Sequence, residues 1–340
     1  MLDASVWSKL SWLESQDAVG TSYERLHKRS LNTRRRLEIT AAAKQAREYF
    51  VQASRSDLSV RPLLTFYGVS SLSRACVLLI GKHEGESSLQ TGHGLRQVGW
   101  RNKLNGNLAT ALEGLNALSV ETCDGLYLDL AKHTNNQNCL HTNSSAVDWS
   151  VSYEVPQSGQ CVSLESLVSR MPDLKEELTT SGIESRFEMV NNISYSQDSG
   201  LLIKKGNKKS SSVFLAYEEL GYTRNSDVGS EKLSCSSDIF AKSPVQLLNS
   251  LVDLPFPVPN LFLVEPLWGG VSQICFTFKI SFILGMLARY FPTHWMNLIN
   301  GAKGDRHRSI IIKCQRVVEV TFPFLIEELI RYNETMVEKG

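Results

Sequence analysis

Residues 60–80 read VRPLLTFYGVSSLSRACVLLI, and this stretch is apolar on nearly every side. Pro62 stands where a helix would begin, and a proline is tolerated there because its missing N–H would have no partner within the helix. Gly81 follows as a stop signal. A helix that is apolar all round is a buried helix. The stretch therefore predicts a central helix around which the rest of the fold packs.

Further helices are predicted on either side of this centre. Residues 34–54 give an amphipathic pattern rich in Ala, Arg, Glu and Gln, which are good helix formers, and residues 107–118 give a shorter helix. Residues 271–290 are apolar over most of their length, so we expect this helix to pack against the helix at 60–80. Pro323 is expected to kink or break the last helix of the chain.

The apolar run at 271–291 is also long enough to span a bilayer. Gln273, Lys279 and Ser281 interrupt it, and a lysine in the middle of a membrane span is costly. The run therefore favours a central helix of a soluble bundle, and we expect no contact with a membrane.

Residues 121–240 have a different character. Asn and Ser cluster at 133–145, as in loops, whereas residues 148–156 alternate as in a strand. We expect a mainly α protein, in which a helical bundle is formed by an N-terminal region (1–120) and a C-terminal region (241–340) that packs on it. The middle region is expected to be an irregular α+β insertion with a small antiparallel sheet.

Composition and charge narrow the class of protein. The chain has 36 Lys and Arg against 35 Asp and Glu, a net charge of +1, so any contact with nucleic acid must come from a local patch. Seven widely spaced cysteines without a CxxC pair indicate a reducing compartment rather than a disulfide framework. The first residues lack the basic region and apolar run of a signal peptide, so we expect a cytoplasmic protein.

Metal and cofactor motifs are not evident in the sequence. Cys123, His133, Cys139 and His141 lie close together in the chain, but their spacing matches no familiar zinc pattern. The glycine motifs that bind nucleotides and dinucleotides do not occur either. We therefore expect neither a metal site nor a cofactor.

The segment HGLRQVGWRNKLNG (93–106) combines basic, aromatic and glycine residues. Arg and Lys pair with phosphates, Trp offers a face for stacking, and Gly allows close approach of the backbone. The segment is thus either an ordinary solvated surface loop or a loop that contacts nucleotides or nucleic acid, and the sequence leaves both interpretations open. The candidate binding residues in this segment are His93, Arg96, Trp100, Arg101 and Lys103.

Two more basic loops, KKGNKKSSS (204–212) and KGDRHRS (303–309), are predicted to be turns. If they lie near residues 93–106, together with Arg61 and Arg289, they would form a positive face despite the nearly neutral total charge. Such a face would suit RNA, DNA or an acidic partner protein, and Arg61 is therefore a further candidate binding residue.

Arg289 and His294 are the candidate catalytic pair. Their spacing, R-x4-H, resembles the motif of HEPN-type helical ribonucleases, in which the arginine stabilises a phosphate and the histidine assists attack by a ribose 2′-OH without metal. In this sequence Tyr290 follows the arginine, where HEPN motifs usually place a polar residue, and Pro292 interrupts the spacing. A capped helix end beside an aromatic cluster is the structural alternative for the same residues.

Four blocks of the sequence resemble the YaaC-like family. They are VRPLLTFYGVSSLSRACVLL (60–79), HGL (93–95), VSLESLVSRMPDL (162–174) and FILGMLARYFPTHW (282–295), and they follow the order of the family. The resemblance covers most of the chain. It implies a bacterial, mostly helical protein, but it implies no particular activity because none is settled for the family.

Two functional hypotheses follow from these observations. The first is a helical binding or interaction protein that engages a partner protein or nucleic acid through its basic loops. The second is a HEPN-like, metal-independent ribonuclease of the toxin or phage-defence kind that uses Arg289 and His294, and it would bring two copies of His294 together across a homodimer.

Overall fold

The central apolar stretch forms helix α4 (Arg61–Ile80), with Pro62 in its first turn and Gly81 directly after its end. The structure is a computed structural model, and it describes residues 4–82, 85–206, 212–227, 230–252, 259–302 and 304–339. Most side chains of α4 are buried, including those of Phe66 and Leu78. The prediction of a buried central helix at 60–80 is confirmed.

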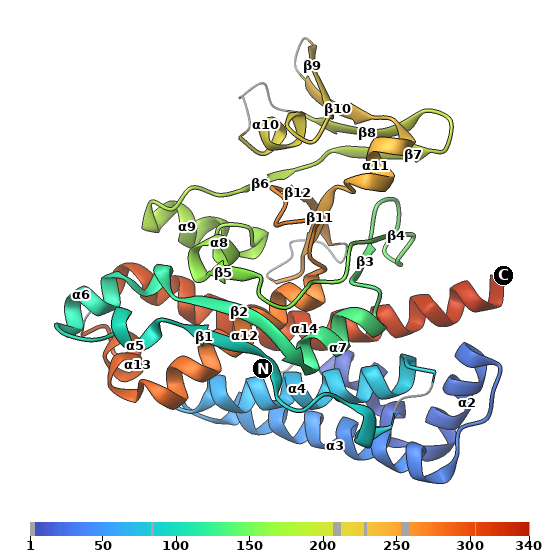
Figure 1. Ribbon diagram of the computed structural model, residues 1–340, viewed down its shortest axis with the longest axis horizontal. Coiled ribbons are helices and arrows are strands. Elements are labelled where there is room, and N and C mark those ends of the chain that lie inside the picture. The colour runs from blue at the N-terminus through green and yellow to red at the C-terminus, as the bar shows by residue number, and fades with distance from the viewer. Residues whose placement is uncertain are drawn as a thin grey trace. The chain divides into compact units, whose positions relative to one another are not determined.

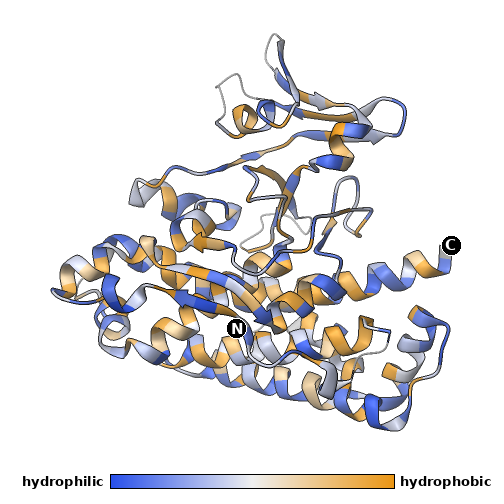
Figure 2. Cartoon of the chain, in the orientation of Figure 1, coloured by the Kyte–Doolittle hydropathy of each residue, from blue (hydrophilic) through white to orange (hydrophobic). Residues whose placement is uncertain are grey.

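Helix α3 (Thr33–Arg55) runs beside α4 (Figure 1). Polar and apolar residues are interspersed along α3, and its buried residues recur at the spacing of one helix face (Figure 2). Gly68 of α4 allows the two helices to approach closely, because a Cβ atom at this position would lie 2.7 Å from the ring of Phe50. A larger residue at position 68 would therefore push the two helices apart.

Helix α12 (Gln273–Tyr290) contacts α4 through aromatic rings. The ring of Phe66 lies edge-on to Phe278 and Phe282, with centroids 6.0 and 5.5 Å away. Gly285 leaves room for this packing, since a Cβ atom there would lie 2.8 Å from the Phe66 side chain. The predicted contact between the helices at 60–80 and 271–290 is present.

Pro292 and Pro323 have different effects on the helices near the C-terminus. Phe291 separates α12 from α13 (Pro292–Ile299), Pro292 begins α13, and the two helices are bent by 108°. By contrast, Pro323 lies inside α14 (Asp305–Lys339) and does not break it.

Helix α4 is long and apolar enough to cross a bilayer, and so is α12 if it is joined across its bend to α13. Within α4, 67% of the most apolar 18-residue window is buried inside the protein. A helix whose apolar surface is buried within the fold can have the same length and composition as a membrane span.

The chain divides into two compact units. Unit 1 comprises Met1–Asn136, Val155–Val168 and Ile274–Gly340, and unit 2 comprises Gln137–Glu154 and Ser169–Gln273. The chain therefore leaves unit 1 twice and returns to it twice before it ends.

Unit 1 holds the long helices and one three-stranded antiparallel sheet, in the order β1-β2-β5. Besides α3, α4, α12, α13 and α14, its elements are α1 (Ala4–Leu10), η1 (Ser11–Glu14), α2 (Gln16–His27), η2 (Glu86–Ser88), β1 (His93–Val98), α5 (Trp100–Lys103), α6 (Leu108–Glu113), η3 (Leu115–Ala117), β2 (Ser119–Gly125), α7 (Leu126–His133), β5 (Cys161–Ser163) and α8 (Leu164–Val168).

Unit 2 holds three small antiparallel sheets, in the orders β7-β8-β10-β9, β11-β12-β6 and β3-β4. Its elements are β3 (Gln137–Leu140), β4 (Trp149–Ser152), η4 (Pro172–Leu174), α9 (Lys175–Ser181), β6 (Phe187–Met189), β7 (Asn192–Ser196), β8 (Gly200–Lys205), α10 (Ser212–Glu218), β9 (Thr223–Asp227), β10 (Ser230–Cys235), α11 (Ser237–Lys242), β11 (Gln246–Ser250) and β12 (Asn260–Val264).

The expected fold class, a mainly α helical bundle with one small α+β insertion, is wrong. Within the described residues, four small sheets are interspersed along the chain, and strands occur in all three expected regions. Strand β1 lies in the region expected to be the N-terminal helical part, and β11 and β12 lie in the region expected to be the C-terminal helical part. The protein is an α+β protein with a long-helix core in unit 1.

The physical reason for this error differs between β1 and β11. The glycine and the basic residues of 93–98 indicate a loop, but Gly94 is required where the backbone of β1 passes that of Gly125 and Tyr127. Strand β11 is buried at four of its five residues, so it lacks the alternation of a half-exposed strand. A short, wholly buried apolar run does not distinguish a strand from a helix.

Candidate functional site

One pocket of unit 1 gathers several of the predicted binding residues. It has a volume of about 460 Å³ and lies where β1 and α5 meet the end of α12. We call it the β1 pocket. Its lining residues are His93, Leu95, Arg96, Gln97, Arg101, Phe282, Met286, Tyr290 and Phe291.

His93 stands at the start of β1 and is half-buried in the wall of this pocket. Its ring lies edge-on to Phe66, with centroids 4.9 Å apart, and 6.2 Å from the ring centroid of Phe282. Burial lowers the pKa of the imidazole below its usual value, and the positive charges of Arg289 and then Arg74 lower it further. His93 is therefore neutral at pH 7, and it lies within electrostatic reach of two guanidinium groups.

Arg289 lies in the last turn of α12 and is exposed. Its Nη1 donates a hydrogen bond to the hydroxyl of Tyr67 at 3.0 Å, and its guanidinium lies 5.0 Å from the ring centroid of Tyr290. Within the part of the chain that the structure describes, neither Arg289 nor Arg74 nor Arg101 forms an ion pair with a carboxylate. No carboxylate among the described residues therefore compensates the positive charges of these three side chains near the β1 pocket.

The other residues of the predicted basic loop have different surroundings. Arg96 pairs with Glu121, its neighbour across the β1–β2 ladder. Lys103 donates to the carbonyl oxygen of Ala117 and, at 3.3 Å, to Oγ of Ser119. Two of the predicted phosphate contacts are therefore already engaged within the protein.

Trp100 is 2% exposed. Its Nε1 donates to the carbonyl oxygen of Ser119 at 2.7 Å, and its ring lies 6.1 Å from that of Phe291. A ring this deeply buried has no open face for a base. The exposed aromatic side chain at the pocket is Tyr290, which is 55% exposed.

His294 lies on α13, beyond the bend that follows Arg289. Its half-buried ring packs edge-on against Phe291 at 5.9 Å. Among the lining residues of the β1 pocket, the one histidine is His93. The structure thus brings a histidine from another part of the chain, His93, close enough to Arg289 for the guanidinium to lower its pKa.

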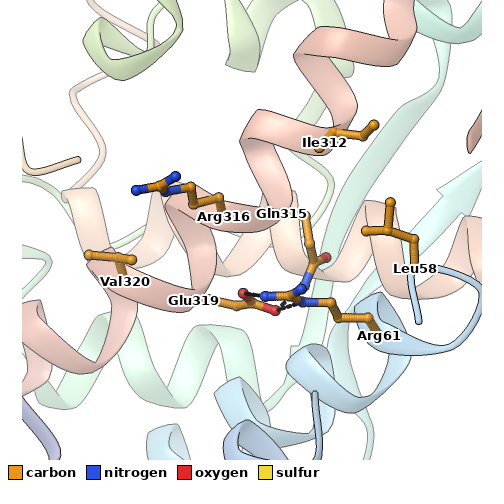
Figure 3. Close-up of a pocket in the computed structure, with 7 residues that line it drawn as sticks. All are labelled: Leu58, Arg61, Ile312, Gln315, Arg316, Glu319 and Val320. Atoms are coloured by element: carbon orange, nitrogen blue, oxygen red, sulfur yellow. Dashed lines mark hydrogen bonds and ion pairs between the residues drawn. The ribbon is translucent and has the colours of Figure 1, made fainter. Parts of the chain in front are cut away.

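Arg61 lies in a second pocket of unit 1, between α4 and α14, which has a volume of about 410 Å³. We call it the Arg61 pocket. Figure 3 shows the Arg61 guanidinium meeting the Glu319 carboxylate, whereas Arg316 points away from them. Nε of Arg61 donates to Oε1 of Glu319 at 2.6 Å and Nη2 donates to Oε2, and the same carboxylate accepts from Thr65 and Gln315. Arg61 is thus held by an ion pair with Glu319, whose carboxylate also accepts from two other side chains of the protein.

Some predicted features fall outside the described residues. These are positions 207–211 of the first basic loop and Lys303 of the second. Among the residues that are described, no group of three or more His, Cys, Asp and Glu side chains is arranged to hold a metal ion.

Sequence reasoning missed Tyr67, Arg74, Gln97 and Tyr290. A signal was available for two of them. Arg74 is the one charged residue within α4 after Arg61, and Tyr67 precedes it by seven positions, so both lie on the same helix face. A charged residue in an otherwise apolar helix indicates a place where that helix reaches the surface or a site.

The family indicated by the four sequence blocks is also the family whose model matches the chain. A family model described as "YaaC-like Protein" matches residues 11–330, and the chain therefore belongs to the YaaC-like family. No curated protein and no solved structure matches the chain.

Proposed function

We propose that this YaaC-like protein binds single-stranded nucleic acid at the β1 pocket. The observation that carries the proposal is a set of three arginines, Arg74, Arg101 and Arg289, that have no carboxylate partner among the described residues and lie beside a half-buried neutral histidine. Arginines without a counter-charge attract anions, and the guanidinium fork matches a phosphate group.

The form of the pocket favours a single strand over a duplex. A volume of about 460 Å³ is of the size that holds one small ligand, such as a nucleotide unit, and Tyr290 offers an exposed ring beside it. Stacking of unpaired bases on aromatic side chains, together with backbone contacts to Arg, is how sequence-tolerant single-strand binding works. With a net charge of +1, the chain does not carry the general excess of positive charge that favours binding along a duplex.

The nuclease hypothesis would need Arg289 and His294 to meet on one scissile phosphate. Arg289 donates to Tyr67, the ring of His294 packs on Phe291, and a bend of 108° separates their helices. These contacts support binding without cleavage by this pair. Labelled RNA incubated with the protein and EDTA should remain intact, and cleavage that disappears in His294→Ala would instead support the nuclease.

The binding proposal is tested by fluorescence anisotropy with labelled single-stranded RNA and DNA 12-mers over a series of salt concentrations. The double variant Arg101→Gln/Arg289→Gln should bind about tenfold more weakly or worse, because two phosphate contacts are lost. The slope of log affinity against log salt should fall by about 1.4, since each contact to a single strand contributes about 0.7.

A matched control removes two positive charges elsewhere. Arg34→Gln/Arg55→Gln changes two exposed residues of α3 and should leave affinity and salt slope unchanged. Equal losses in both double variants would mean that only net charge matters. No binding of either oligonucleotide at low salt would contradict the proposal outright.

A further inference from the structure

Unit 2 contains a pocket with the opposite character to the β1 pocket. Its volume is about 490 Å³, and we call it the Trp149 pocket. One side comes from the loop between β3 and β4, and the other from β7. The lining residues are Thr142, Asn143, Asp148, Trp149, Asn192, Ile193, Ser194 and Tyr195.

The loop side of the pocket is held by Asp148. Its Oδ1 accepts from the backbone N–H and the hydroxyl of Thr142 at 2.9 and 2.8 Å, and its Oδ2 accepts from the N–H of Asn143 at 2.6 Å. These hydrogen bonds keep the pKa of Asp148 below its usual value although burial acts in the other direction. The loop is therefore pre-organised, which reduces the entropy that a ligand loses on binding.

The strand side of the pocket is an edge. Strand β7 is the terminal strand of the order β7-β8-β10-β9, so half of its backbone N–H and C=O groups face away from the sheet. Four consecutive residues of β7 line the pocket, although side chains of a strand alternate between two faces. The pocket must therefore run along the strand edge, where backbone groups supplement the hydroxyl of Ser194 and the amide of Asn192.

An aromatic ledge lies at the same place. The rings of Trp149 and Tyr195 are nearly parallel, with an angle of 20° and centroids 6.3 Å apart, and Phe240 lies parallel to Trp149 at 6.0 Å. Tyr195 is 43% exposed, which is unusual for a large ring that already has two aromatic neighbours. An exposed ring next to a row of polar groups can cover the apolar face of a ligand while its edge is hydrogen-bonded.

Charge decides which ligand class fits. The lining residues include one carboxylate and no cation, so nothing in the pocket would compensate a phosphate or a carboxylate. The nearest cationic position in the sheet register is Lys204, opposite Asn192, and it does not line the pocket. The remaining groups are hydroxyls, amides and backbone groups, and hydroxyl-rich ligands satisfy such mixed donors and acceptors because each hydroxyl both donates and accepts.

We propose that the Trp149 pocket binds a neutral saccharide. The apolar C–H face of a sugar ring lies on Tyr195 and Trp149, and its hydroxyls are bound by Asn143, Asn192 and Ser194. This site is independent of the nucleic-acid site, because none of its residues belongs to the β1 pocket.

Isothermal titration of the whole protein with maltotriose, cellotriose and chitotriose tests this proposal. At least one of these neutral trisaccharides should bind, whereas the anionic trigalacturonate should bind more weakly than the neutral sugar. Tyr195→Thr and Asn192→Thr should each weaken the binding about tenfold, since each removes one principal contact. Both positions are exposed on an edge strand and Thr suits strands, so both variants should fold. Asn192→Thr should melt close to the wild type, and Tyr195→Thr should melt slightly lower because it loses the ring contacts with Trp149 and Phe240.

Trp268→Asn is the control, because it removes another exposed aromatic ring of unit 2 and Asn tolerates the positive φ of that position. It should bind the sugar as the wild type does. Failure of all three neutral sugars to bind would overturn the proposal, and so would unchanged binding in both Tyr195→Thr and Asn192→Thr. Because nucleic-acid binding is measured with other variants, either proposal can fail while the other stands.

Discussion

The Arg61 pocket and the β1 pocket both contain arginines that the sequence marks as candidate phosphate contacts, but they place them in opposite situations. In the Arg61 pocket the guanidinium meets Glu319, and Thr65 and Gln315 complete the network around that carboxylate (Figure 3). Near the β1 pocket, Arg101 and Arg289 have no carboxylate partner among the described residues. The same residue type therefore stabilises the fold in one pocket and remains available to a ligand in the other.

The partners that distinguish these arginines are distant from them in the sequence. Arg61 and Glu319 are 258 positions apart, and Arg289 and its partner Tyr67 are 222 positions apart. Removing one member of a buried ion pair is costly, because the other charge is left uncompensated. Removing an exposed charged side chain that has no ion-pair partner costs little. Substitutions can thus separate the two roles by their effects on stability and on binding.

The largest effect should come from a charge placed where no partner exists. Leu284→Asp puts a carboxylate into the contact region of α12, where Leu284 is 1% exposed. A charge buried without a partner is among the most unfavourable changes to a core, so we expect no soluble folded protein. Expression and thermal melting provide the measurement.

Leu37→Asp is the matched control, since Leu37 is 50% exposed on α3 and the new charge stays in water. This variant should melt close to the wild type. Leu284→Ala should fold but lose about 2–5 kcal/mol, as for other large-to-small changes in a core. A Leu284→Asp protein that melts like the wild type would show that α12 is not a core helix.

An intermediate effect is expected from Arg61→Met. This change leaves the Glu319 carboxylate without its main partner, and breaking a buried pair typically costs 3–5 kcal/mol. Because 26% of the Arg61 side chain is exposed, we expect a smaller loss of about 2–4 kcal/mol in the free energy of unfolding. Urea denaturation measures this loss, and nucleic-acid binding should not change.

Arg101→Met should show the reverse pattern. It changes an exposed residue without an ion-pair partner among the described residues, so stability should change by less than about 0.5 kcal/mol while binding weakens. The double variant Arg61→Met/Glu319→Met should recover much of the stability lost in Arg61→Met, because no carboxylate is then left unpaired. If Arg61→Met weakened binding without affecting stability, the distinction between the two pockets would be lost.

The sequence predicts the long helices of this protein well because their patterns are strong. The amphipathic pattern at 34–54 and the apolar stretch at 60–80 correspond to α3 and α4 within a residue at each end. The sequence does not predict strands β1 and β11, because β1 combines a glycine with polar residues as a loop does and β11 is buried over most of its length. Propensity and periodicity do not describe elements whose conformation is decided by tertiary contacts.

The candidate site was predictable only in part for the same reason. His93, Arg96 and Arg101 do line one pocket, as their closeness in sequence suggests. Burial of the Trp100 ring and the engagement of Lys103 by backbone oxygen could not be inferred, because both depend on where residues 117–119 lie. The contribution of Arg289 to the site comes through the fold, which places it close enough to His93 to lower the pKa of that histidine.

The smallest expected effect concerns pH. In the free protein, burial and the charges of Arg289 and Arg74 hold the pKa of His93 below its usual value, so the ring is neutral at pH 7. A bound phosphate favours the protonated ring and raises that pKa, and linkage then requires affinity to rise as the pH falls. Between pH 7.5 and pH 5.5 we expect single-stranded RNA to bind about two- to tenfold more tightly, as measured by anisotropy at constant ionic strength.

His93→Gln keeps a polar side chain but cannot be protonated in this range, so its affinity should change little with pH. His294→Gln should retain the wild-type pH profile, because the ring of His294 packs against Phe291 and does not line the β1 pocket. If His294→Gln flattened the profile and His93→Gln did not, His294 would be the histidine that meets the phosphate. That result would support the pair Arg289 and His294 as the candidate for cleavage, since a histidine that titrates against a bound phosphate can act as the acid or base in phosphoryl transfer.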